Sequence, residues 1–549
     1  MFLRTQHVSG RTYLLLVENA RIDGKVTQRI LQRFGRMDLL RESGQLDAIV
    51  AGLGRFSEHL VVLGAHHRGE SMQSEARRIG GPLVFERLWE TTGIADVVRE
   101  ALADRHFGFP VERAVFLTVL HRLMAPGSDR AAERWKDEYV LPGTEGLKLH
   151  HLYRAMAWLG EVLPTQEQAG ATPFAPRTRK DAIEERLFAT HRDLFTNLSL
   201  VFFDTTSIYF EGAGGETIGH YGHSKDHRPD RKQMVVGMVL DLEGRPLCCE
   251  IWPGNTTDVK SLLPIVDRLR TRFQIGRVCI VADRGMISRD VIEEIETRKD
   301  CWYILGVRMR AVKAMRELLA ADEGPYEEVF PRTGDRKRPA PLKVRGVTLD
   351  ARTYVLCLNE DEATKDRHDR EAIVAALRDA LRGGDTALVG NKGYRRYLKS
   401  TGHRFDVDEA KVAADARFDG KWVLTTNTGL DPRATALAYK QLWMVESIFR
   451  SMKSVLETRP VYHKCDETIR GHVFCSFLAL VLRKALEDQL AARHWKLEWN
   501  DIIQDLDRLE DTAVTVDSKG YVIRTDPKGT VGKVFQASGA AMPPVIRPC

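Results

Sequence analysis

The amino-acid sequence predicts an α/β protein whose central sheet is partly parallel. From residue 199 to residue 308, short runs rich in Val, Ile and Phe alternate with segments whose apolar residues recur at helical spacing. Two helical segments join strand-like runs, and a crossover of this kind is what parallel strands require. Helical segments before this block and short strands after it predict further layers or domains.

Composition limits the class of protein. The chain has 549 residues, of which 43% are hydrophobic and 29% charged, as in a soluble globular protein of two or more domains. Its net charge of +6 permits a polyanionic partner without requiring one. No uncharged apolar run is long enough to span a membrane, and the first residues, "MFLRTQHVSG", lack the core of a signal peptide. The eight cysteines form no CxxC pair, which argues against a zinc module or disulfide framework and for a reducing cytoplasm.

The residues before the α/β block form two regions. Residues 11–18 and roughly 26–33 are predicted to be strands joined by a turn at "IDGK". Residues 85 to about 195 have mostly helical periodicity. The segments 125–129 and 172–180 interrupt it, and the second of these has the composition of a linker.

The α/β block has a definite order of elements. The predictions are a strand from 199, a hairpin of 234–241 and 245–252, a helix at 258–273, a strand at 277–283, a helix at 287–299 and a strand at 302–308. The strands that begin at 199, 277 and 302 are expected to be parallel, because helical crossovers connect them.

Residues 309–435 break this rhythm. They contain short strands, "YVLCLN" and "WVLTTNT", a charged helix around 360–382 and many turn residues, so we interpret them as an inserted β-rich subdomain. Helices are predicted again at 436–457 and 466–492.

Two aspartates mark the ends of parallel strands. Asp204 lies inside an apolar strand, where an unpaired carboxylate is costly. Asp283 ends the run "VCIVAD", and Arg284-Gly285 breaks the strand directly after it. Binding sites of open α/β sheets form at the carboxyl ends of parallel strands, so both aspartates are candidate site residues. The alternatives are a buried Asp204 paired with an arginine and an Asp283 that caps a helix.

A third acidic residue lies on the predicted helix 439–457. On a helical wheel, Glu446, Arg450 and Lys453 fall within about 40° of Tyr439. The opposite arc is apolar and is expected to pack on a core. The alternative is an ordinary amphipathic surface helix with ion pairs between successive turns.

Three carboxylates at close range repel one another, so a divalent cation is the natural compensation. Asp204, Asp283 and Glu446 are therefore predicted to bind Mg²⁺ or Mn²⁺ through hard oxygen ligands. Two such ions about 4 Å apart would activate a nucleophile and stabilise a leaving oxygen in phosphoryl transfer.

These residues resemble a known family. The order strand-Asp, hairpin, helix, strand-Asp, insertion, helix-Glu is similar to that of the DDE transposases of bacterial insertion sequences, which have an RNase H-like catalytic core. The last helix resembles their YREK signature, Tyr-x2-Arg-x3-Glu-x6-Lys, at Tyr439, Glu446 and Lys453, with Leu442 in the Arg position. The segments "YGHSKDHRPDRKQ", "PGNTTD", "RPVYHKCDETIRGHVFCSFLAL" and "GRTYLLLVENARIDGKVTQRILQRFGR" also resemble this group.

The resemblance implies a transposase that cleaves DNA at transposon ends and transfers the strand into target DNA. It implies Asp204, Asp283 and Glu446 as catalytic metal ligands with two Mg²⁺ or Mn²⁺ ions. It also implies double-stranded DNA with terminal inverted repeats as the partner, a homodimer on that DNA, and a place beside the bacterial nucleoid. A Trp of the insertion often holds a flipped base in this group. Trp302 and Trp422 are candidates, and the alternative for each is a core aromatic.

Tyr439, Arg450 and Lys453 share the Glu446 face of the helix and are predicted to contact DNA phosphates. Arg450 is predicted to take the role of the Arg that Leu442 replaces. Leu442 itself is expected to pack at the edge of the apolar arc.

A basic loop, "HSKDHRPDRK" at 223–232, is a second candidate for DNA contacts. Its candidate residues are Lys225, Arg228, Arg231 and Lys232. The alternative is a solvated hairpin loop. His463 and His472 resemble metal ligands, but a phosphate contact or a structural role is preferred because hard cations favour oxygen. Asn255 and Asp258 are expected to cap the helix at 258.

The predicted domain order follows from these blocks. It is a β-containing region at 1–80, a helical DNA-binding region at 81–195, the first part of the core at 196–308, the β-rich insertion at 309–435, C-terminal core helices at 436–495 and a C-terminal region at 496–549. Two other functions remain open at this stage: a structure-specific nuclease that makes no strand transfer, and a DNA-binding relic without catalysis.

Overall fold

The computed structural model describes residues 2–22, 25–54, 73–168, 171, 175–190, 200–286, 288–309, 313–320, 324–332, 339–349, 352–382, 396–401, 404–516 and 519–548. The chain forms two compact units. The first contains residues 1–84, 137–140 and 490–549, and the second contains residues 85–136 and 141–489. Each unit is described by itself.

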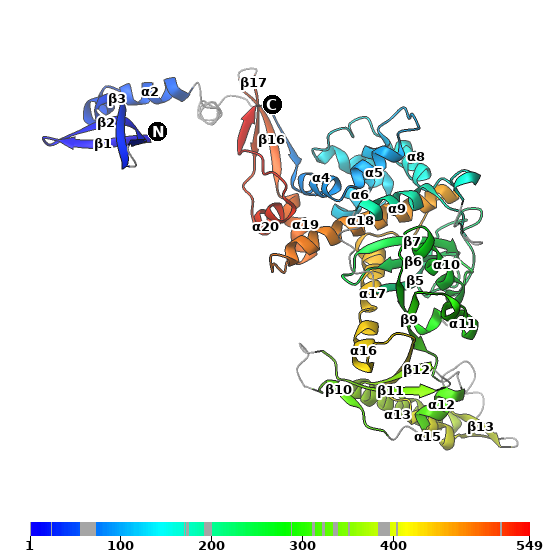
Figure 1. Cartoon of the computed structure of the whole chain (residues 1–549). Helices are drawn as coiled ribbons and strands as arrows, with labels where there is room; N and C mark the ends of the chain where they lie inside the picture. The colour runs from blue at the N-terminus through cyan, green and yellow to red at the C-terminus, as the bar shows by residue number, and fades with distance from the viewer. Residues whose placement is uncertain are drawn as a thin grey trace. The chain divides into compact units, whose positions relative to one another are not determined.

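A nine-stranded sheet organises the described part of the second unit, in the order β10-β11-β12-β15-β9-β8-β5-β6-β7. Figure 1 labels β5, β6, β7, β9, β10, β11 and β12 of this sheet. The strands are β5 (Val201–Tyr209), β6 (Gln233–Leu240), β7 (Pro246–Pro253), β8 (Val278–Ala282), β9 (Cys301–Val307), β10 (Glu327–Phe330), β11 (Leu342–Leu349), β12 (Arg352–Leu358) and β15 (Lys421–Thr426). The three central strands β5, β8 and β9 are parallel, as predicted, and the other pairs are antiparallel.

The central strands are apolar because helices and other segments bury them. Helices α10 (Asp258–Thr271) and α11 (Arg289–Thr297) make the predicted crossovers, and their apolar residues join the buried cluster of β5, β8 and β9. Strand β8 has no exposed residue, as expected for a parallel strand covered on both faces. Of the predicted elements in this block, only the first residue of the strand at 199 and of the helix at 287 lie outside the described residues.

The strands of the predicted insertion continue the main sheet. Strand β15 pairs antiparallel with β9, with Val423 opposite Val307, and β12, β11 and β10 follow outward. The segment also contributes α12 (Lys313–Ala320), α13 (Glu360–Arg382), α15 (Glu409–Ala416) and the hairpin of β13 (Leu398–Thr401) and β14 (Arg404–Val407). The β-rich composition was predicted, but the shared sheet was not. Without β15, β9 would be an edge strand with unpaired backbone groups, and pairing satisfies them.

The predicted helix at 436–457 consists of three pieces. These are α16 (Pro432–Lys440), α17 (Trp443–Arg450) and a π-helix (Ser451–Val455). The Asp431 side chain caps α16, with Pro432 in its first turn. The prediction of one continuous helix from Tyr439 to Glu457 was therefore wrong, because apolar periodicity does not reveal a one-turn break or a π-turn.

The region predicted at 85–195 is mostly helical in its described residues, and residues 191–195 lie outside them. It contains α4 (Gly80–Thr91), α5 (Ile94–Ala101), α6 (Val111–Met124), α7 (Asp129–Trp135), α8 (Leu149–Leu159) and α9 (Arg179–Thr190). Helix α8 lies close against α18 (Asp466–Ala491), because Gly471 has no side chain: a Cβ there would lie 1.9 Å from the carbonyl oxygen of Met156. Part of the predicted linker, residues 172–174, lies outside the described residues.

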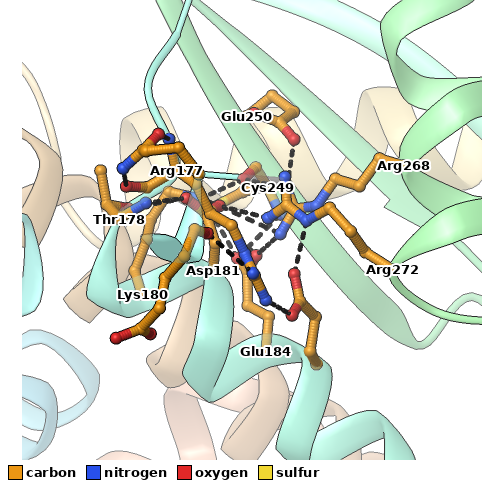
Figure 2. A network of polar contacts seen from close by, with 12 residues as sticks. Arg177, Thr178, Lys180, Asp181, Glu184, Cys249, Glu250, Arg268 and Arg272 are labelled. Carbon is orange, nitrogen blue, oxygen red and sulfur yellow. Dashed lines mark hydrogen bonds and ion pairs between the residues drawn. The ribbon is translucent and has the colours of Figure 1, made fainter. Parts of the chain in front are cut away.

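Buried charges join α9 to the sheet (Figure 2). Lys180, Asp181 and Glu184 of α9 meet Glu250 of β7 and Arg268 of α10. The Nζ of Lys180 lies 2.6 Å from Asp181 and donates to the carbonyl oxygen of Cys249 at 2.7 Å. Arg268 pairs with Asp181 at 3.1 Å and bonds the carboxylates of Glu184 and Glu250. Each charge in this network therefore has an internal partner.

The first unit contains two antiparallel sheets. One is β1 (Phe2–Val8), β2 (Arg11–Ile22) and β3 (Lys25–Arg36), followed by α1 (Met37–Glu42) and α2 (Gln45–Gly54). The two predicted strands are longer than expected, β1 was not predicted, and two residues of the predicted turn lie outside the described residues. The other sheet has the order β18-β17-β16-β4.

The second sheet of this unit joins distant parts of the chain. It pairs β4 (Gln73–Arg78) with β16 (Glu510–Val516), and it continues through β17 (Lys519–Arg524) and β18 (Ile546–Pro548), beside α19 (Trp499–Asp507) and α20 (Val531–Ser538). The predicted regions 1–80 and 496–549 thus share a sheet, which a division along the sequence cannot express. No helix in the described ranges is long and apolar enough to cross a membrane.

Candidate active site

A cavity of about 450 Å³ brings the three predicted carboxylates together. Asp204 comes from β5, Asp283 follows β8, and Glu446 lies in the first turn of α17. The parallel register pairs Phe203 with Ala282, so the two aspartates follow at the same level of adjacent strands, as predicted. The lining residues are Asp204, Asp283, Arg284, Gly306, Val307, Met309, Lys421, Trp422, Val423, Tyr439, Lys440, Leu442, Trp443 and Glu446.

Asp204 is half-buried, with 19% of its side chain exposed. Its Oδ1 accepts a hydrogen bond from the amide of Thr205 at 2.7 Å. Burial raises the pKa of Asp204 to about 6, and the negative charges of Asp283 and Asp258 act in the same direction, against the Lys225 ammonium. Internal cations therefore only partly compensate this carboxylate.

Asp283 is held by a tyrosine from a distant helix. The hydroxyl of Tyr439, in α16, donates to Oδ1 of Asp283 at 2.9 Å. Burial and the adjacent Asp283 charge raise the pKa of the Tyr439 hydroxyl far above its ordinary value, so it remains a donor. Gly306 of β9 leaves room for this contact, since a Cβ there would lie 2.6 Å from the hydroxyl oxygen. The structure thus places Tyr439 against a carboxylate, whereas the sequence predicted a DNA phosphate as its partner.

Glu446 is exposed at the mouth of the cavity, and Leu442 is buried with 6% exposure, as predicted. Arg450 is exposed but does not line the cavity. Three cationic side chains that the sequence analysis did not single out do line it: Arg284, Lys421 and Lys440. Arg284 could have been noticed in the sequence because it directly follows a strand-end Asp. Lys421 and Lys440 have no comparable sequence signal.

Lys225, which was predicted to contact DNA, lies beside Asp204 instead. Its Nζ donates to the carbonyl oxygen of Thr205 at 2.7 Å and to the Thr205 hydroxyl at 2.9 Å. It also lies 3.3 Å from Oδ2 of Asp258 and 3.9 Å from Oδ1 of Asp204. Asp258 is the first residue of α10, and its carboxylate accepts from Thr205 at 2.6 Å. Asp258, which was predicted to cap α10, therefore contacts Thr205 and Lys225 through its carboxylate.

Two further predicted DNA contacts are engaged in ion pairs on the surface of the basic loop. Arg228 bonds both carboxylate oxygens of Asp230 at 2.9 Å. Arg231 pairs with Glu211 at 2.9 Å and with Asp230 at 3.3 Å. These side chains remain 35% and 40% exposed, so they are accessible to solvent. Lys232, next in the loop, is half-buried.

The predicted aromatic candidates differ in position. Trp302 is half-buried in β9 and does not line the cavity, whereas the half-buried Trp422 of β15 does. Trp443, the first residue of α17, also lines the cavity and is 62% exposed. Trp443 was not predicted as a site residue, although the helical wheel places it about 40° from Tyr439, on the same face as Glu446.

A second polar cluster in this unit has a different character. Among the described residues, Asp129, His463 and His472 are the only group of three whose potential ligand atoms lie within 4.8 Å of one another. His472 donates through Nε2 to the carbonyl oxygen of Thr458 at 3.0 Å, so its Nδ1 is an acceptor. The Arg122 guanidinium donates to that Nδ1 at 2.9 Å, where it would repel a bound cation. The cluster is therefore a satisfied structural arrangement, as preferred from the sequence.

Comparison with known families agrees with this geometry. A model of the transposase DDE domain matches residues 196–482, more than half of the chain, and a model of the N-terminal domain of IS1634 family transposases matches residues 3–63. A comparison with curated proteins gives no match. Proteins of the DDE family are enzymes that cleave and join DNA strands, and they generally use divalent metal ions. With this match over most of the α/β unit, the chain belongs to the DDE transposases of insertion sequences.

Proposed function

We propose that Asp204, Asp283 and Glu446 are the catalytic carboxylates of this transposase and that they bind two Mg²⁺ or Mn²⁺ ions. The observation that carries the proposal is the single cavity that all three line, although they are far apart in the sequence. Asp283 directly follows β8, and Asp204 lies at the same level of β5, where the parallel pairing of the two strands ends; this position supports the proposal. This arrangement also supports an RNase H-like core within the sheet.

The residues of the cavity fit a hard divalent cation. Carboxylate oxygens are the ligands that Mg²⁺ prefers. Asp204 is enclosed beside Asp283 and Asp258, and the raised pKa of its carboxyl group shows that a positive charge would stabilise its ionised form. When bound, the metal ions supply Lewis-acid chemistry that activates water and stabilises the leaving oxygen of a phosphodiester.

The protein's own residues position the reacting groups. Tyr439 orients Asp283 through its hydrogen bond, and Thr205 orients Asp204 through its amide. Arg284, Lys421 and Lys440 add positive charge to the lining, where DNA phosphates would enter. The exposed indole of Trp443 supports base stacking at the cavity mouth. Trp443 is a better candidate for base stacking than Trp302, which does not line the cavity.

The DNA partner follows from this chemistry. We infer that the substrate is double-stranded DNA with the terminal inverted repeats of the element, that target DNA receives the freed strand, and that the protein acts as a homodimer beside the nucleoid. The helical region 81–195 is the proposed end-binding domain, and residues 309–435 are the proposed insertion. Arg228, Arg231, Lys232 and Arg450 remain proposed phosphate contacts because each is at least partly exposed.

The test is a cleavage and joining assay with labelled transposon-end DNA and Mg²⁺. Each of Asp204→Asn, Asp283→Asn and Glu446→Gln should lower cleavage by at least about 1000-fold while end binding stays intact. The matched control is Glu293→Gln, an exposed carboxylate on α11 that pairs with Arg289. Wild-type cleavage in the three cavity variants would refute the assignment. Cleavage without joined products would show a nuclease only.

A further inference from the structure

The loop between β5 and β6 reaches both elements that carry proposed catalytic carboxylates. It holds its shape through several hydrogen bonds to the sheet. The amide of Lys225 donates to the Ser207 hydroxyl at 2.8 Å, and the Gln233 side chain donates to the carbonyl oxygen of His223 at 2.9 Å. The Ser224 hydroxyl accepts from the amide of Arg228 at 3.0 Å. These bonds present the side chains of Lys225 and Asp226 in fixed directions.

The first of these side chains contacts the Asp204 side of the cavity. Through Nζ, Lys225 donates to the carbonyl and hydroxyl oxygens of Thr205, the residue that follows Asp204. It also pairs with Asp258 at 3.3 Å. Lys225 therefore attaches the loop to the middle of β5 and to the start of α10.

The next side chain contacts the Glu446 side. Oδ1 of Asp226 lies 2.7 Å from Nζ of Lys453 and 2.5 Å from Nη1 of Arg459. Lys453 is in the π-helix that continues α17, and Arg459 follows that helix. The side chains of Asp226 and Lys453 are only 4% and 12% exposed. A DNA phosphate could not reach Lys453 in this arrangement without displacing the loop.

We propose that Lys225 and Asp226 are positioning residues that hold the strand carrying Asp204 at a fixed distance from the helix carrying Glu446. The inference rests on the proposed function, because it assumes that both carboxylates act together. It assigns Lys453 an internal role in place of the DNA contact predicted from the sequence. The π-helix contributes because its wider turn changes the direction in which Lys453 points relative to Glu446.

A backbone contact already brings the two elements side by side. The amide of Val461, after the π-helix, donates to the carbonyl oxygen of Tyr209 at 3.2 Å, and the amide of Glu211 donates back to Val461 at 3.0 Å. The two residues that Asp226 contacts, Lys453 and Arg459, lie along the chain between Glu446, which lines the cavity, and Val461. Removing the Asp226 contacts should leave the fold intact and loosen the spacing of the carboxylates. A misplacement of about 1 Å can lower a catalytic rate by about 100-fold.

The test uses the full chain with transposon-end DNA and compares Asp226→Asn, Lys453→Met and the double variant. We expect each to lower single-turnover cleavage by about 100-fold, with the double variant no worse than either single variant. Asp226→Glu should restore part of the rate. End binding and its dependence on salt should stay as in the wild type, while half-maximal cleavage should require more Mg²⁺. The matched control is Glu216→Gln, an exposed residue of the same loop, which should cleave normally.

Other results would overturn the proposal. If Lys453→Met reduces the salt slope of binding by about one and Asp226→Asn strengthens binding, Lys453 is a phosphate contact. Wild-type cleavage by Asp226→Asn would also contradict it. If that variant does not fold, Lys225→Met decides, with intact binding and lost cleavage expected. Asp204→Asn and Glu446→Gln are measured in parallel. If these two variants cleave normally, the proposed function fails. If they are inactive while Asp226→Asn is active, only the positioning role of Lys225 and Asp226 is refuted.

Discussion

Two clusters of charge in the α/β unit differ in how their charges are compensated. In the network at α9, the carboxylates of Asp181, Glu184 and Glu250 are balanced by Lys180, Arg268 and Arg272 (Figure 2). The side chains of Glu184 and Arg268 are at most 1% exposed. No ligand is needed to make such a cluster stable, and it serves to attach the helical region to the sheet.

The candidate active-site cavity has the opposite balance. Asp204 has the Lys225 ammonium at 3.9 Å, while the neighbouring Asp283 and Asp258 carboxylates add negative charge. The pKa of Asp204 is raised, whereas the charges of Lys180, Arg268 and Arg272 overcome burial and hold the pKa of Asp181 below its ordinary value. The comparison indicates that the buried acids at α9 have internal partners for their charge, whereas the partly compensated Asp204, beside two further carboxylates, fits a cationic ligand.

The largest expected effect concerns the compensated cluster. Arg268→Met removes the cation that contacts Asp181, Glu184 and Glu250, so it should lower the free energy of unfolding by about 3–5 kcal/mol. Urea denaturation followed by circular dichroism measures this loss. Arg289→Met, which breaks an exposed pair with Glu293, is the control and should cost less than about 1 kcal/mol. Equal effects of the two substitutions would remove the distinction between the clusters.

The second prediction concerns pH, because the two aspartates shift in opposite directions. The lowered pKa of Asp181 contributes stability above the unfolded pKa, and this contribution is lost as the pH falls through the lower folded value. The pKa of Asp204 is raised to about 6, so its contribution is present below the unfolded pKa and is lost as the pH rises toward 7.

The measurement is the free energy of unfolding against pH in the absence of divalent cations. Relative to the wild type, Asp204→Asn should gain on the order of 2 kcal/mol between about pH 4 and pH 7. Asp181→Asn should instead be most destabilised at neutral pH and approach the wild type in acid. Parallel profiles for all three proteins would show that the two sites are electrostatically alike.

The last prediction concerns Tyr439→Phe. The substitution removes one hydrogen bond to Asp283 and leaves the ring that packs beside Gly306. A lost hydrogen bond to a charged group corresponds to about 1.5–3 kcal/mol, so cleavage should fall by about 10- to 100-fold with little change in end binding. A weakened salt dependence of binding with normal cleavage would restore the phosphate contact predicted from the sequence.

Much of the site could be predicted from the sequence because each strand and helix that carries a site residue forms from a pattern of neighbouring residues. Apolar strand runs that alternate with helical crossovers predict that β5, β8 and β9 are parallel. This places Asp204 and Asp283 at the same level of neighbouring strands. The acidic position on the last helix followed from its amphipathic pattern. The family resemblance agreed with all three and is supported by the match over residues 196–482.

What only the tertiary structure decided are the partners of these residues. A helical wheel assumes a regular helix, so it could not show the break before Trp443 or the π-turn that contains Lys453. The cations Lys225 and Lys453 look alike in sequence whether they face DNA or a carboxylate. The sequence by itself therefore determined which elements form and where the acids lie. Contacts between residues far apart in the chain decided which charges are neutralised internally, because pairing depends on distance in space.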